Sequence, residues 1–223
     1  MGVLFRMVNF GSKATRVIGS FARKLGYGYR LVVFLLCFSA ASASAGPGLI
    51  QLNEAGRIPI AGRSTPYNIR HLPVASFPQV PTTVQDGLGE RGCLVPQTYE
   101  AHQPENVIHG SFERAGSSDW AVLCSVRGTA SLLVFFGSDP KHPFTLASIP
   151  ETERLRVHDS TGVLGFDWGI DAASPRQVYD AQAGTYPRQP MVSHDAVADS
   201  IVEHSTEYHY YSNGAWTLLP TPN

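Results

Sequence analysis

Two aspartates that flank a tryptophan have the side chains and the spacing most similar to those of a catalytic acid–base pair. Asp167 and Asp171 bracket Trp168-Gly169-Ile170 in the stretch FDWGID. Glycosidases cleave a sugar bond with two carboxylic acids. The stretch supplies no third group to orient such a pair, and aspartates are also common where they cap turns. We therefore prefer the interpretation that each aspartate caps a turn, and keep the acid–base pair as the alternative.

Histidine is the second residue type that could do chemistry, and the chain has eight of them. Imidazole is a frequent metal ligand, but no spacing among these histidines demands a metal site. We therefore expect surface or hydrogen-bonded histidines, and predict no metal and no cofactor. The four histidines considered as converging ligands are His109, His194, His204 and His209.

The end of the chain predicts a β-hairpin, because Asn213-Gly214 separates two runs of β-forming residues, 207–211 and 215–219. Alternation along a strand sends its aromatic residues to both faces. One set can pack on the core, whereas aromatics left in water are typical of a binding surface. The alternative is that other elements cover both faces. The candidate binding surface comprises Tyr208, Tyr210, Tyr211 and Trp216.

The first 45 residues resemble a secretory signal peptide. They contain six basic residues and no acidic residue, followed by the apolar run LVVFLLCF at 31–38 and by Ala43-Ser44-Ala45. The apolar run is shorter than the roughly 20 residues that span a bilayer. We predict cleavage after residue 45, secretion or delivery to a periplasm, and no transmembrane segment in the mature protein. An uncleaved anchor is the alternative.

Removal of the leader leaves an acidic domain with two cysteines. Eleven Lys and Arg then stand against 18 Asp and Glu, a formal net charge of −7. A domain with this net charge is not expected to attract nucleic acid or an anionic membrane. Cys37 lies in the leader, so Cys93 and Cys124 remain. An even cysteine count in an exported chain predicts one disulfide between them, with two separate buried thiols as the alternative.

The first segment after the expected leader shows little sign of regular secondary structure. Residues 46–81 are rich in proline and glycine and show no sustained period, which predicts an irregular arm. Residues 82–92 predict a short helix, capped by one of two threonines at its start and ended by Gly92. Val84 and Leu88 fall on one face of that helix. The single domain is expected to extend from 82 to 223.

The centre of the chain predicts an antiparallel β-meander made of residues 107–112, 119–125 and 131–136, joined by short glycine-containing links. Ser174 caps a helix that begins at Pro175. Residues 193–204 predict another helix, because acidic residues recur there at i, i+4 and i+8. The fold class is therefore α+β, with a meander, a C-terminal hairpin and a few short helices. Further strands are expected at 144–149, 154–158 and 162–167.

One stretch of the meander, GSFERAGSSDWAVL at 110–123, resembles a single repeat of the FG-GAP or VCBS type, and the resemblance extends to 137. In that family the turn aspartates bind calcium and several repeats close a β-propeller. Here Asp119 is kept, while Ser111, Glu113 and Ala115 stand at the other turn positions. The resemblance implies a blade-like antiparallel meander, and too few hard ligands remain for calcium. The remaining matched residues are Gly110, Phe112, Gly116, Ala121, Val122 and Phe136-Gly137.

Neither the G-x-S-x-G elbow, the H-E-x-x-H motif nor the P-loop occurs in the chain. The serines of Gly116-Ser117-Ser118-Asp119 are typical of a tight turn. We therefore expect a non-enzymatic binding or envelope protein with a protein or small-molecule partner that the sequence does not identify. The alternative is a small secreted hydrolase whose site is assembled from dispersed Asp and His residues.

Overall fold

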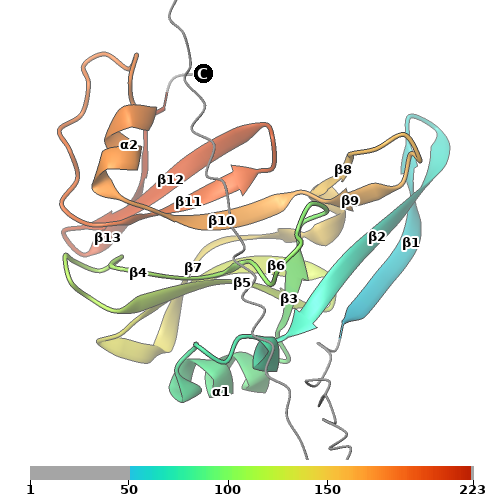
Figure 1. The fold of residues 1–223 in the computed structure, drawn as a ribbon, viewed down its shortest axis with the longest axis horizontal. Helices are drawn as coiled ribbons and strands as arrows, with labels where there is room; N and C mark the ends of the chain where they lie inside the picture. The colour runs from blue at the N-terminus through green and yellow to red at the C-terminus, as the bar shows by residue number, and fades with distance from the viewer. Residues whose placement is uncertain (1–50, 222–223) are drawn as a thin grey trace, which may run out of the picture. The chain divides into compact units, whose positions relative to one another are not determined.

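The computed structural model describes residues 51–221, so the expected leader and its cleavage site lie outside the described residues. The described chain folds as two β-sheets and two α-helices (Figure 1). In this part of the chain, no helix has the length and apolarity needed to cross a membrane. The α+β class with a dominant antiparallel component and one disulfide is confirmed.

The predicted meander is the centre of the larger sheet. Strands β5 (Asp119–Val126), β6 (Thr129–Phe136) and β7 (Asp139–Pro150) pair antiparallel in chain order, and β4 (Val107–Gly110) pairs with β5 on its other side. Every residue of β5 except the last is buried. Strand β6, predicted from a nearly continuous apolar run that is typical of a strand with both faces covered, is also mostly buried.

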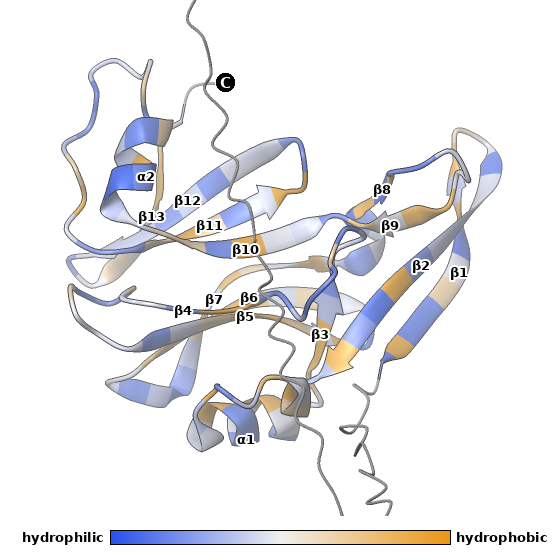
Figure 2. Cartoon of the chain, in the orientation of Figure 1, coloured by the Kyte–Doolittle hydropathy of each residue, from blue (hydrophilic) through white to orange (hydrophobic). Residues whose placement is uncertain are grey.

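The segment expected to be an irregular arm is instead a long hairpin, which corrects the sequence prediction. Strands β1 (Leu52–Ile60) and β2 (Arg63–Pro73) pair over nine residues. Ala61 and Gly62, with φ of 47° and 78°, form the turn, and positive φ at both central positions suits a hairpin. Pro59 is tolerated because β1 is an edge strand. Both strands are mostly hydrophilic, with a few hydrophobic residues between (Figure 2).

Three short strands complete the larger sheet. They are β3 (Leu94–Gln97), β8 (Leu155–Val157) and β9 (Leu164–Phe166), and the strand order is β7-β6-β5-β3-β2-β9-β8. The β2–β9 pair is parallel, and every other pair described in this sheet is antiparallel. The ladder between β3 and β5 is the shortest in this sheet, since its register contains only Leu94 opposite Ser125.

The smaller sheet is an antiparallel meander of β10 (Trp168–Ala173), β11 (Ala196–Ile201), β12 (Ser205–Ser212) and β13 (Ala215–Leu219). It includes the predicted C-terminal hairpin. The helix predicted for 193–204 is wrong, because this segment contains β11. Asp199, expected on a wet helix face, is 8% exposed and accepts a hydrogen bond from Trp168 Nε1. Pairing with two neighbouring strands therefore overrides the local acidic period.

The two sheets enclose the main core, and a helix covers the outer face of each. Phe112, Leu132 and Phe166 of the larger sheet region pack with Trp168 and Val197 of the smaller sheet. Helix α1 (Thr82–Glu90) closes a second cluster on the other face of the larger sheet. Helix α2 (Pro175–Ala181) packs through its buried valine on the smaller sheet. The remaining helical pieces are the 3-10 turns η1 (Val74–Ser76) and η2 (Glu151–Glu153).

The helix ends show which capping predictions were correct. Pro81 is the N-cap of α1 and no side chain caps this helix, so the predicted threonine cap is wrong. Val84 and Leu88 are buried as predicted, and Gly92 follows the helix with φ of 71°. Ser174 caps α2 through a capping box that includes Gln177, which confirms the prediction made from the Ser-Pro pair.

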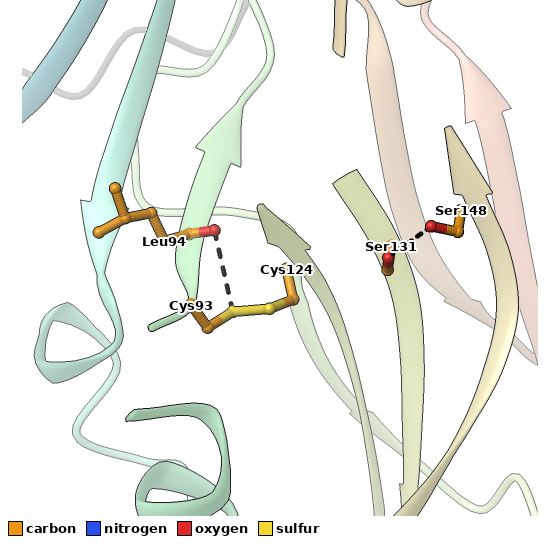
Figure 3. The surroundings of a disulfide bond; sticks show 5 residues. All are labelled: Cys93, Leu94, Cys124, Ser131 and Ser148. Atoms are coloured by element: carbon orange, nitrogen blue, oxygen red, sulfur yellow. Dashed lines mark hydrogen bonds between the residues drawn. A yellow bond between two sulfur atoms is a disulfide. The ribbon is translucent and has the colours of Figure 1, made fainter. Parts of the chain in front are cut away.

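The predicted disulfide joins Cys93, directly after α1 and Gly92, to Cys124 in β5 (Figure 3). Their Cα atoms are 5.2 Å apart, and 31 residues separate them in the sequence. The bond lies beside the Leu94–Ser125 pair, so it crosslinks β3 to β5 where the backbone ladder is shortest. Figure 3 also shows Ser131 and Ser148 hydrogen-bonded across β6 and β7 at 2.9 Å.

Candidate functional site

A cleft of about 510 Å³ opens between the segment that follows β3 and the strands of the smaller sheet. Binding sites for small molecules are commonly cavities of this size. The wall from the larger sheet consists of residues 98–106, and the opposite wall consists of β10 and the turn between β11 and β12. The lining side chains discussed below are Thr98, Glu100, Glu105, Asn106, Asp171, Ser200, Glu203, His204, Ser205 and Thr206.

The charged lining of the cleft is acidic. Glu100, Glu105, Asp171 and Glu203 contribute four carboxylates, and no lysine or arginine is found among the described residues that line the cleft. None of these carboxylates takes part in an ion pair within residues 51–221. Like charges gathered in one cleft create a negative potential that attracts cations.

Glu105 is held in place by hydrogen bonds to its own neighbourhood. Its carboxylate oxygen Oε1 accepts from the backbone N–H of Thr98 at 2.8 Å. The backbone of Glu105 in turn donates to Gln97 Oε1 at 2.9 Å and accepts from Gln97 Nε2 at 3.0 Å. Gln97 is 2% exposed. These reciprocal bonds fix the acidic side chain on the end of β3.

Asn106 joins the two walls of the cleft. Its side-chain nitrogen donates to the carbonyl oxygens of Pro96 at 2.8 Å and Trp168 at 3.1 Å, and its side-chain oxygen accepts from the backbone of Ile170 at 3.0 Å. Asn106 has φ of 66°, a left-handed conformation that asparagine adopts more readily than most residues. Figure 1 shows the segment after β3 running toward β10, where these bonds form.

Asp171 is the titratable group of the cleft with an altered pKa. Shielding by the cleft walls, and secondly the negative charge of Glu105, raise the pKa of the Asp171 carboxyl above its ordinary value. The residue itself remains solvent-accessible, so water moderates the effect. A carboxyl whose pKa is raised inside a cleft is a candidate for proton transfer.

A buried polar atom also belongs to the cleft wall. Thr98 is 2% exposed, and its hydroxyl oxygen has no hydrogen-bond partner among the described residues. An unpaired buried hydroxyl costs about 1–3 kcal/mol. The hydroxyl of Thr98 is therefore a buried polar group of the wall that no described residue satisfies.

The structure places the two aspartates of the sequence analysis in different environments. Asp171 lines the cleft, whereas Asp167 is 4% exposed and accepts from Arg156 Nε at 3.0 Å. Asp167 does not line the cleft. The carboxyl that accompanies Asp171 is Glu105, which no local spacing in the sequence connects to it.

The four histidines considered as metal ligands do not converge. His204 lines the cleft, His209 lies 3.3 Å from Asp199, and His109 Nε2 lies 2.9 Å from the hydroxyl of Ser118. His194 contacts the hydroxyl groups of Ser193 and Tyr210 and the carbonyl of Tyr211. The four histidines therefore lie in four separate places and do not form a common metal site.

The four aromatic residues of the predicted binding surface lie on both faces of the smaller sheet, and both faces are packed. Tyr208 and Tyr210 belong to the cluster under α2. Tyr211 and Trp216 form an aromatic cluster with Phe136 and Phe144, with ring centroids 4.8–6.3 Å apart. All four are at least partly buried, so they contribute to packing within the protein.

Gly87 to Gly92 reads GLGERG, a G-x-G-x-x-G spacing that the sequence analysis overlooked. In dinucleotide-binding folds this motif links a strand to the start of a helix, so that phosphate meets free backbone N–H groups. Here the glycines lie in the second half and at the C-terminal end of α1. This placement gives the motif no phosphate-binding role.

The comparisons with known proteins give no family to which this chain could be assigned. No family model matches it, and no similar sequence was found among curated proteins and no similar fold among solved structures. The fold and the cleft are therefore the only basis for a class: a disulfide-bonded domain of two β-sheets, with an acidic cleft between the segment after β3 and the smaller sheet.

Proposed function

We propose that the protein is an exported binding domain whose acidic cleft holds a ligand that carries amino or guanidinium groups. The observation that carries this proposal is the presence of four carboxylates in one cleft, with no lysine or arginine among the described residues that line it. A bound cation relieves the repulsion between these carboxylates and gains charge-assisted hydrogen bonds from them. The hydroxyls of Ser200, Ser205 and Thr206 offer further donors and acceptors.

Export is supported by two independent observations. The leader has the three parts of a signal peptide. The disulfide between Cys93 and Cys124 is of a kind that persists in oxidising compartments and is rare in the cytosol. An acidic domain of this charge has no basic surface for nucleic acid, so the expected partner is a cationic small molecule or peptide.

Titration of the full-length protein with the peptide triarginine tests the proposal. At low ionic strength we expect saturable one-to-one binding in calorimetry, weakened by added salt. The double variant E105Q/D171N keeps the shape of both side chains and should lose about tenfold in affinity, the equivalent of two exposed charge contacts.

The matched control is D139N, which neutralises a carboxylate that is 57% exposed and does not line the cleft. It should bind triarginine as the wild type does, and triglutamate should not bind to any of the three proteins. Equal affinity of the wild type and the double variant, or an equal loss in D139N, would contradict the proposal.

A second candidate function is glycoside hydrolysis in the same cleft, and the raised pKa of Asp171 beside Glu105 favours it. Asp171 and Glu105 would be the pair of carboxyls that such a reaction uses. Release of nitrophenol from a panel of nitrophenyl glycosides by the wild type, abolished in both D171N and E105Q, would select the hydrolase. Triarginine binding without such turnover would select the binding domain.

A further inference from the structure

Three side chains with metal-ligating atoms meet away from the acidic cleft. Glu54 lies in β1, His71 in β2 and Glu151 at the start of η2, and one ligand atom of each lies within 4.8 Å of the others. Leu52 is opposite His71 in the β1–β2 register, so Glu54, two residues further on, points to the same face of the sheet. The hairpin missed by the sequence analysis brings the first two of these residues together.

The deeper part of this group is almost completely buried. His71 is 3% exposed and Glu151 is 1% exposed, and Nε2 of the imidazole lies 2.8 Å from Oε1 of the carboxylate. The second oxygen of Glu151, Oε2, is buried and has no hydrogen-bond partner within residues 51–221. An unpaired oxygen on a buried carboxyl lowers the stability of the folded protein. This oxygen can therefore accept a hydrogen bond or bind a cation.

A cavity of about 280 Å³ gives access to this group, since Glu54 and His71 both line it. The cavity is bounded by Gly92 and Leu94 on either side of Cys93 and by Ser125 next to Cys124. The disulfide therefore holds the cavity walls. Arg127 is its one cationic lining side chain among the described residues, and the two carboxylates of the group outnumber it.

We propose that Glu54, His71 and Glu151 bind a divalent transition metal of the Zn²⁺ type, with water from the cavity completing the coordination. One imidazole nitrogen and two carboxylate oxygens are ligands that Zn²⁺ accepts, and three protein ligands with one open position is a familiar arrangement. Ca²⁺ needs six to eight oxygens and Mg²⁺ prefers oxygens and water. The proposal does not depend on the function of the acidic cleft.

Binding requires only a small rearrangement of the buried pair. Zinc ligands at about 2.1 Å from the metal lie roughly 3.4 Å apart in a tetrahedron, and the His71–Glu151 contact is 2.8 Å. The pair must therefore open by about 0.6 Å while Glu54, which is exposed, turns inward. The hydroxyl of Tyr67 lies 3.5 Å from Glu54 Oε1 and can orient that carboxylate when it binds.

Calorimetric titration with ZnCl₂ alone tests the proposal on the full-length chain, produced without a polyhistidine tag and stripped with a chelator. We expect one Zn²⁺ per chain at neutral pH, with no competition from Ca²⁺. E54Q changes only an exposed side chain and should therefore fold, yet it should bind about 100-fold more weakly, since even outer-shell changes cost 10–100-fold. H71Q should abolish the visible absorption of bound Co²⁺.

The control variant is H142Q, which removes an exposed histidine that lies 2.8 Å from Asp139 and could hold zinc on the surface. It should bind Zn²⁺ as the wild type does. Absence of Zn²⁺ binding, full affinity in a folded E54Q, or loss of binding in H142Q would each overturn the proposal and would leave His71 and Glu151 as a buried hydrogen-bonded pair.

Discussion

The carboxylate oxygen Oδ1 of Asp119 accepts a hydrogen bond from the backbone N–H of Gly137 at 2.8 Å. Asp119 begins β5 and Gly137 follows β6, so this bond ties the far end of the central hairpin. The other carboxylate oxygen accepts from the backbone of Glu113 at 2.7 Å and from the hydroxyl of Ser117. At the aspartate position kept from the FG-GAP-like pattern, protein donors thus occupy both oxygens.

Replacement of Asp119 by alanine should destabilise the protein strongly. Asp119 is 0% exposed, and its removal leaves the N–H groups of Glu113 and Gly137 without their acceptor. Hydrogen bonds to a charged group contribute about 1.5–3 kcal/mol each, so we expect the free energy of unfolding in urea to fall by about 3 kcal/mol or more. D139N, at an exposed carboxylate, is the control. A loss below about 1 kcal/mol for D119A would contradict this account.

Loss of the disulfide should lower stability because the unfolded chain gains freedom. For a sequence separation of 31 residues, the loop-entropy relation gives about 4 kcal/mol. The local effect adds to this, because β3 and β5 share a single register pair beside the bond. Urea unfolding of the double variant C93S/C124S should show a lower midpoint than the wild type. The wild type treated with a reductant should shift in the same direction, and equal midpoints would refute the prediction.

The raised pKa of Asp171 predicts a pH effect with a defined sign. Below its ordinary pKa of 3.8, both the folded and the unfolded chain hold the proton. Between that value and the raised pKa, the folded state binds more protons than the unfolded state, so this group makes stability fall as pH rises. D171N cannot ionise and should therefore gain in melting temperature relative to the wild type on going from pH 3 to pH 7.

The size of that pH effect should be modest, since Asp171 is solvent-accessible. A D171N protein whose melting temperature runs parallel to that of the wild type across the pH range would show that the cleft does not disfavour the ionised form of Asp171.

Local patterns predicted a large part of the fold. The meander follows from buried apolar runs with short glycine links, the last hairpin from Asn213-Gly214, and the second helix from Ser174-Pro175. The hairpin of β1 and β2 was missed because its prolines resemble a linker, although an edge strand such as β1 tolerates Pro59. Strand β11 was predicted as helix because its acidic spacing fits a helical face.

The candidate sites could not be predicted in the same way, because their residues are distant in sequence. Glu105 and Asp171 share a cleft only because Asn106 is hydrogen-bonded to β10, 64 residues further on at Ile170. His71 and Glu151 are 80 residues apart. No period or motif encodes such pairs, and the expectation of no metal came from spacing alone.

The sequence by itself determined the acidic charge, the pairing of Cys93 with Cys124 and the order of most strands, because each of these depends on composition or on neighbours within a few residues. Only the tertiary structure decided which polar side chains lie together: the four carboxylates of the cleft, and the group of Glu54, His71 and Glu151. The physical reason is that strand pairing and sheet packing set these distances, and both are driven by burial of apolar surface far from the polar groups that they bring together.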